Sequence, residues 1–214
     1  MSKTRFYLIR HGESIGNRYK IILGHTDLDL TEQGYEQAKR TAEELSDVDF
    51  DAVYSSDLMR AYNTAAPHAA LRNMEIIPDK NLREIYVGDW ENTSRDKIRE
   101  LFGDMYDKGF VDSFGVFKFP GGESTQEAAD RMYEEIELIA KKEQGKTVLL
   151  ASHAAAIRAF FGKIMKINPE DIASTIPFPS NASYSTFEYE NGVFTPLEYS
   201  VDGHLAELFT TWTR

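Results

Sequence analysis

Three short apolar runs along the chain are typical of buried strands, because each is bounded by polar, charged or glycine residues. The runs are residues 5–9, 50–54 and 147–151. Behind each of them, small and apolar residues recur at helical spacing on one face. Parallel strands need such helical crossovers, so this alternation predicts a parallel sheet with helices on its faces.

Residues whose side chains hydrogen-bond the unpaired backbone N–H groups mark the start of several predicted helices. Thr31 is a good N-cap for the first long helix, and Ser124 with Glu127 forms a Ser-x-x-Glu capping box at the start of another. Asp57 is expected to cap the helix after the second strand, and Pro67 to kink that helix or end it early.

The last part of the chain predicts a β-hairpin. Residues 184–190 and 193–199 flank Asn191-Gly192, a strong short-range hairpin signal. The expected fold class is therefore α/β: a three-layer α/β/α sandwich with a mostly parallel central sheet and an antiparallel hairpin at its edge.

No repeat or linker divides the sequence, so we expect a single domain over residues 1–214. Residues 103–122 are rich in glycine and phenylalanine without a regular period, and we interpret them as an excursion or lid.

Composition and net charge limit the classes of molecule that the protein is expected to bind. The 214 residues are 42% hydrophobic, contain no cysteine and carry a net charge of -11. No basic cluster offers a surface for nucleic acid or an anionic membrane, so neither partner is expected, and a cytoplasmic location is the default. The missing cysteines exclude thiolate chemistry and disulfides. If the ligand is an anion, the positive charge that binds it must be local.

Two histidines stand directly after predicted strands. If the first and third strands are neighbours, His11 and His153 lie side by side at the carboxyl edge of the sheet, where open α/β sheets bind ligands. Arg10, Arg60 and Glu84 also fall in or near the segments that follow strands. This set suits phosphoryl transfer without a metal: arginines neutralise phosphate oxygens, a neutral imidazole attacks phosphorus, and a carboxyl group protonates the leaving oxygen. Taken singly, each residue also has an ordinary structural explanation.

Six ordered segments resemble the motifs of the histidine phosphatase superfamily, also called the phosphoglycerate mutase-like family. The segments are Leu8–Ser14, Asp27–Gly34, Tyr54–Ala61, Leu82–Glu91, Gly121–Ser124 and Ser152-His153. The resemblance implies an α/β/α sandwich and chemistry that requires neither a metal nor a cofactor. It implies these roles: His11 is the phosphorylated nucleophile, Glu84 is the proton donor, and Arg10, Asn17, Arg60, His153 and the backbone of Ala154 bind the phosphoryl group.

Two departures from the family pattern are visible. Ala154-Ala155 stands where two glycines are common, which keeps the backbone N–H groups but brings methyl groups near the phosphate. Asp29 stands where proline is common, which alters the entry to the first long helix.

The resemblance favours a metal-independent phosphomonoester hydrolase acting on a small phosphorylated metabolite. A cofactor-dependent phosphoglycerate mutase is the alternative; in those enzymes Asn precedes the acidic residue and Arg-His-Tyr-Gly follows it, whereas here the loop is Leu82–Gly88. A phospho-ligand-binding domain without turnover is a second alternative. Substrate identity and oligomeric state are left open.

Several further side chains are secondary candidates. His25 stands in a loop where it either contacts substrate or is exposed, and His68 and His204 are interpreted as surface or packing residues. The dispersed carboxylates and the histidine spacing predict no metal site. Four aromatic residues form either an apolar wall that selects the substrate or ordinary core: Phe110, Phe114, Phe117 and Phe119.

Overall fold

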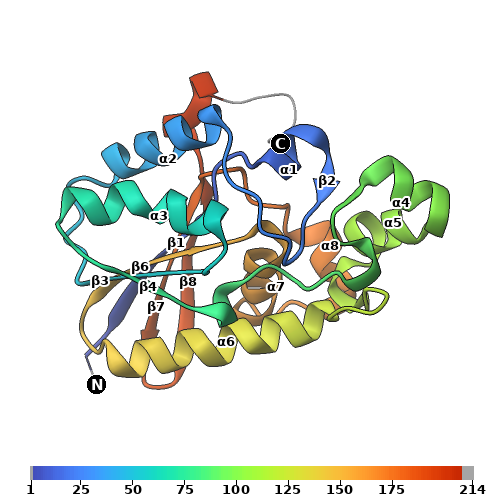
Figure 1. Cartoon of the computed structure of the whole chain (residues 1–214). Coiled ribbons are helices and arrows are strands. Elements are labelled where there is room, and N and C mark those ends of the chain that lie inside the picture. Colours follow the sequence, from blue (N-terminus) through green and yellow to red (C-terminus); the bar gives the residue numbers. More distant parts are fainter. Residues whose placement is uncertain (1, 209–214) are drawn as a thin grey trace.

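A central sheet of six strands organises the molecule, of which the computed structural model describes residues 2–208 (Figure 1). The strands are β1 (Thr4–Arg10), β2 (Ile21–Ile22), β3 (Ala52–Ser55), β4 (Ile76–Pro78), β5 (Thr93–Ser94), β6 (Thr147–Ser152), β7 (Tyr184–Glu190) and β8 (Val193–Val201). The order across the central sheet is β4-β3-β6-β1-β7-β8, while β2 and β5 form a small antiparallel pair of their own. Thus β1 and β6, which carry the two histidines, are neighbours.

Strands β4, β3, β6 and β1 pair with one another in parallel. At the edge of the sheet, β7 pairs antiparallel with β1, and β8 pairs antiparallel with β7. Asn191 and Gly192 connect β7 to β8 with φ values of 51° and 84°. Positive φ at both positions suits the turn that matches the twist of a two-residue hairpin. The predicted mostly parallel sheet with an antiparallel edge hairpin is confirmed.

Helices cover both faces of the sheet. They are α1 (Ile15–Tyr19), α2 (Glu32–Glu44), α3 (Met59–Leu71), α4 (Arg95–Phe102), α5 (Met105–Asp107), α6 (Thr125–Lys142), α7 (Ala154–Ile164) and α8 (Ile172–Thr175). The pair α2 and α3 lies on one face and the pair α6 and α7 on the other, which gives three layers (Figure 1).

The alternation of side chains along the central strands explains why both faces are apolar. Val53 and Leu149 belong to the cluster under α2 and α3, whereas Tyr54 and Leu150 belong to the cluster under α6 and α7. Successive residues of a strand point to opposite faces, so a strand buried on both sides must be apolar throughout. This is the physical reason for the continuous apolar runs in the sequence.

Two predicted caps are confirmed. Thr31 accepts a hydrogen bond from the backbone N–H of Gly34 at the start of α2. At the start of α6, Ser124 and Glu127 exchange both hydrogen bonds of a capping box.

The predicted cap at Asp57 is wrong. Helix α3 begins at Met59, and the Met59 N–H donates to Asp27, a residue from a distant loop. Asp57 instead accepts two hydrogen bonds from the guanidinium of Arg83, at 2.5 and 2.6 Å. Arg83 offers a full positive charge and two parallel hydrogen bonds where a backbone N–H offers one, so the long-range partner takes the carboxylate.

Pro67 does not end α3 early, because the helix continues to Leu71. The proline removes the bond that its N–H would give to the Asn63 carbonyl. Beyond it, His68 and Ala69 are buried against the sheet, and this packing offsets the lost bond.

Residues 103–122 contain helical turns that the sequence pattern did not predict. Besides α5 they include a π-helical turn over Lys108–Asp112 and a 3₁₀ turn over Phe114–Val116. Aromatic rings from this segment and from α4 surround the fully buried Trp90, in an apolar cluster that the excursion shares with α6, α7 and α8. Its motion as a lid stays a prediction.

Within residues 2–208, no helix combines the length and the apolar composition that crossing a membrane requires.

Candidate active site

The parallel pairing of β1 with β6 brings the two histidines together. Arg10 is in register with Ser152, and the N–H of His11 donates to the Ser152 carbonyl at 3.0 Å. His11 and His153 therefore follow their strands at the same sheet edge, with ring centroids 5.2 Å apart. The predicted juxtaposition of the two rings is confirmed by this geometry.

His11 is held as a neutral imidazole with a defined tautomer. Its Nδ1 lies 2.7 Å from the Gly12 carbonyl oxygen. Because a carbonyl oxygen only accepts, Nδ1 carries the proton and Nε2 keeps a free lone pair. Burial, reinforced by the charges of Arg60 and Arg10, lowers the pKa of His11 well below its usual value. The ring is thus a neutral nucleophile at physiological pH.

Close backbone packing fixes the turn that follows His11. A Cβ at Gly12 would collide with the Gly34 carbonyl, and a Cβ at Gly34 would collide with the Glu13 carbonyl. The loop after β1 therefore lies directly on the start of α2, and both positions require glycine.

His153 is fully buried between β6 and α7. Its Nε2 lies 2.8 Å from the Ser56 hydroxyl, and its Nδ1 has no partner among the described residues. A hydroxyl both donates and accepts, so this contact fits a proton on either ring nitrogen. Burial, together with the nearby charge of Arg60, lowers the pKa of His153 well below its usual value.

Two buried arginines supply positive charge without an acidic neighbour in contact. The Arg10 guanidinium donates to the Pro179 carbonyl at 2.5 Å. Arg60 donates to the carbonyls of Thr26 and Gly24 at 2.9 and 2.7 Å. Burial lowers the pKa of each arginine to about 10, so both remain charged at neutral pH. Carbonyls orient the guanidiniums but leave their charge available for an anion.

Glu84 reaches the first turn of α7. Its carboxylate accepts hydrogen bonds from the N–H groups of Ala155 at 3.2 Å and Ala156 at 2.8 Å, and from Ile85 at 3.0 Å. The His25 Nε2 lies 2.8 Å from the Glu84 carbonyl. His25 thus contacts the backbone of Glu84 and supports its loop.

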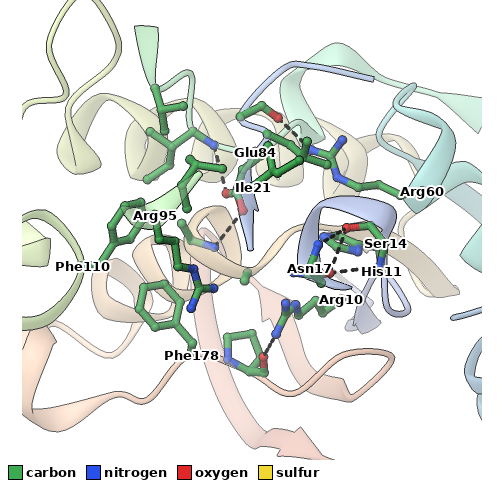
Figure 2. Close-up of a pocket in the computed structure, with 18 of the residues that line it drawn as sticks. Arg10, His11, Ser14, Asn17, Ile21, Arg60, Glu84, Arg95, Phe110 and Phe178 are labelled. Carbon is green, nitrogen blue, oxygen red and sulfur yellow. Dashed lines mark hydrogen bonds between the residues drawn. The ribbon is translucent and has the colours of Figure 1, made fainter. Parts of the chain in front are cut away.

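These side chains surround one cavity of about 410 Å³. Its lining includes Arg10, His11, Asn17, Arg60, Glu84 and Ala154, so the structure brings these predicted site residues together (Figure 2). His153 does not line the cavity, but its ring lies beside that of His11.

The rest of the cavity wall is largely apolar. Phe110 and Phe119 line it, as expected for an aromatic wall, and Phe178 joins them. Phe114 and Phe117 do not line it: Phe114 is fully buried against Phe178, and Phe117 packs on Trp90. Of the four phenylalanines, Phe110 and Phe119 therefore belong to the cavity wall, and Phe114 and Phe117 belong to the core.

Sequence reasoning missed three residues of this site. Arg95, the first residue of α4, lines the cavity with a buried Nε that has no hydrogen-bond partner within residues 2–208 (Figure 2). Asn181 contacts both His11 and Asn17, and Ser56 contacts His153. Ser56 lies inside a matched motif, but no sequence pattern marks the other two.

Comparison with known proteins identifies the fold and the family. A model of the histidine phosphatase superfamily (branch 1) matches residues 6–202. The chain is 31% identical over 207 residues to phosphoserine phosphatase 1 of Hydrogenobacter thermophilus, covering 96% of each chain. It is also 31% identical over 198 residues to the 2,3-bisphosphoglycerate-dependent phosphoglycerate mutase of Pseudoalteromonas atlantica, covering 78% of this chain and 86% of that relative.

Among solved structures, a mutant phosphoserine phosphatase of Entamoeba histolytica in complex with phosphoserine aligns with a TM-score of 0.82. The sequences are 28% identical, and the alignment covers 94% of this chain and 99% of that one. The match to the family model spans the segments that carry His11, Arg60, Glu84 and His153. The chain belongs to the histidine phosphatase superfamily, branch 1.

Proposed function

We propose that this chain is a metal-independent phosphatase that hydrolyses a small phosphomonoester through a phosphohistidine at His11. The observation that carries the proposal is the state of His11: a buried neutral ring whose Nδ1 is bound to the Gly12 carbonyl and whose Nε2 lone pair is free, near two buried guanidiniums that donate to backbone carbonyls. This is the arrangement that an in-line attack on phosphorus needs.

The first step transfers the phosphoryl group to the enzyme. A bond forms between His11 Nε2 and phosphorus while the bond from phosphorus to the ester oxygen breaks, and Glu84 gives its proton to the leaving oxygen. Of the described residues that line the cavity, Glu84 carries the only carboxyl group. Arg10 and Arg60 neutralise the oxygens of the phosphoryl group in transit.

The second step hydrolyses the phosphohistidine. Water forms a bond to phosphorus as the bond to His11 Nε2 breaks, and the Glu84 carboxylate accepts the proton that water loses. The amide of Asn17 and the N–H of Ala154 are hydrogen-bond donors for the phosphoryl oxygens in both steps, and the ring of His153 lies beside that of His11.

The substrate class we propose is a phosphomonoester that also carries a carboxylate. The relative in Hydrogenobacter is named a phosphoserine phosphatase, and the Entamoeba structure holds phosphoserine. In this chain Arg95 enters the cavity between the phosphate end and the aromatic wall (Figure 2). Its unpartnered Nε and fixed charge suit a carboxylate on the leaving group.

Two experiments test the reaction. Purified protein should hydrolyse p-nitrophenyl phosphate with EDTA present, and rapid quenching in alkaline detergent with ³²P-labelled substrate should trap an adduct on the protein that is stable in alkali and labile in acid. His11→Ala should abolish both the turnover and the adduct. Full activity in His11→Ala, or turnover without an adduct, refutes the phosphohistidine. Formation of 2-phosphoglycerate from 3-phosphoglycerate with catalytic 2,3-bisphosphoglycerate would instead identify a mutase.

A matched substrate pair tests the substrate class. Phosphoserine and phosphoethanolamine differ only by the carboxylate, and we expect kcat/KM to favour phosphoserine by roughly tenfold to a hundredfold. Arg95→Met should abolish this preference. Lys97→Met is the matched control, because Lys97 lies on the same helix but pairs with Glu100 at the surface. Equal kcat/KM values for both substrates in the wild type would reject the carboxylate subsite.

A further inference from the structure

Asn181 is a fully buried amide beside the phosphate end of the cavity. It belongs to the segment 177–183, which runs between α8 and β7 and contributes Pro177, Phe178 and Pro179 to the cavity wall. Its Nδ2 donates to the His11 carbonyl at 3.1 Å and to Asn17 Oδ1 at 3.2 Å. One side chain therefore connects the backbone of the nucleophile to the amide of a phosphate-site residue.

The hydrogen bonds fix which way each amide points. Asn181 faces two acceptors, so the edge directed at His11 and Asn17 is its NH₂ group. Asn17 Oδ1 accepts from the Ser14 N–H at 3.0 Å and the Ser14 hydroxyl at 2.9 Å as well as from Asn181. Three donors saturate the two lone pairs of this oxygen, which leaves the NH₂ group of Asn17 for the cavity (Figure 2).

Asn181 is also not needed to satisfy its neighbours. The His11 carbonyl still receives the Ala182 N–H at 3.2 Å, and Asn17 Oδ1 keeps its two bonds to Ser14. Asn181 Oδ1 itself is buried without a partner among the described residues. A buried oxygen without a partner is unfavourable. An apolar side chain of the same shape would therefore suit stability better than asparagine does.

We propose that Asn181 is a positioning residue, which holds the NH₂ group of Asn17 toward the phosphoryl oxygens and fixes it relative to His11. The inference rests on the proposed phosphatase reaction. Ser14 restrains the Asn17 oxygen from one side only, and Asn181 closes the other side, so the amide cannot swing into or out of the cavity. Exact placement of a donor matters because the energy of a hydrogen bond falls steeply with misalignment.

The decisive variant is Asn181→Leu, which keeps the branched shape and removes both polar groups. We expect kcat/KM to fall by about tenfold, whereas the melting temperature stays equal or rises. In an Asn17→Ala background the same substitution should cause no further loss, because the group it positions is gone. Thr41→Val is the control: the Thr41 hydroxyl donates to the Ala182 carbonyl in the same segment at 2.8 Å, without contacting Asn17.

Wild-type kcat/KM in Asn181→Leu would overturn the proposal, and so would a loss that adds fully to that of Asn17→Ala. If Asn181→Leu does not fold, side-chain amide NMR of the wild type decides, with the Asn17 signals assigned by their absence in Asn17→Ala. Restrained signals that shift on adding inorganic phosphate support the positioning role, and signals averaged like those of an exposed asparagine overturn it. This readout needs no turnover, so an inactive wild type would reject the phosphatase reaction without deciding the role of Asn181.

Discussion

His68 is a fully buried histidine in α3, and its two ring nitrogens have no hydrogen-bond partner among the described residues. Its ring packs edge-on against Phe50, with 6.4 Å between centroids. Burial, together with the nearby charge of Arg72, lowers the pKa of His68 to about 3. In an unfolded chain a histidine has a pKa of about 6.5. Folding therefore keeps His68 neutral throughout the mildly acidic range.

The sign of the pH effect follows from this difference. Between the two pKa values only the unfolded chain binds the proton, so stability falls as the pH falls below about 6.5. The free energy of unfolding changes by about 1.4 kcal/mol per pH unit for one proton, which gives a loss of about 2 kcal/mol between pH 7 and pH 5 from His68 alone. The loss continues toward pH 3, where the folded protein also binds the proton.

His68→Leu removes this titration, and urea unfolding at pH 7 and pH 5 measures it. We expect the variant to lose about 2 kcal/mol less than the wild type over that interval. Phe50→Leu is the matched control, since it disturbs the same cluster without removing a titrating group. A variant that loses as much stability as the wild type would refute the reasoning. So would a wild-type His68 NMR signal that titrates near pH 6.5.

Three further changes have expected outcomes. Gly34→Ala should lower the melting temperature by several degrees, because its Cβ would overlap the Glu13 carbonyl beside the catalytic turn; unchanged calorimetry would contradict this. Arg83→Met should cost about 1 kcal/mol in urea unfolding at pH 7. Its effect should shrink as the pH falls through the pKa of Asp57, which Arg83 holds below its usual value; an equal effect at pH 3 would contradict the ion pair. Phe110→Ala should lower kcat/KM for phenyl phosphate more than for phosphoserine, and equal losses would argue against an aromatic wall.

The central sheet and the two histidines were predictable because their signals are local. An apolar run with a polar residue at its end places His11 and His153 at strand ends, and strand–helix alternation makes the strands parallel. The two histidines meet because β6 lies directly beside β1 in the sheet. The apolar character of both strands favours this central position, where each strand is buried on both faces.

Arg95 and Asn181 were not predictable because tertiary packing alone positions them. Asn181 stands in an irregular segment between α8 and β7, and its partners His11 and Asn17 come from the other end of the chain. The predicted cap at Asp57 was wrong for a related reason. Its partner, Arg83, lies 26 residues away in the sequence, whereas capping signals concern only the next few backbone N–H groups. The local sequence indicates which hydrogen bonds a side chain is able to form, whereas tertiary packing determines which partner it binds.

Strand β1 contains the first residues of the active site, yet both strands that pair with it come from the last third of the chain. During synthesis its two hydrogen-bonding edges stay unsatisfied until β6 and β7 have emerged from the ribosome. Unpaired apolar edges of this kind are templates for aggregation, and contacts so distant in sequence form slowly. A nascent chain that stops before β6 therefore contains His11 without His153 beside it. When the full chain refolds, its yield depends on how long β1 is kept from pairing with other molecules.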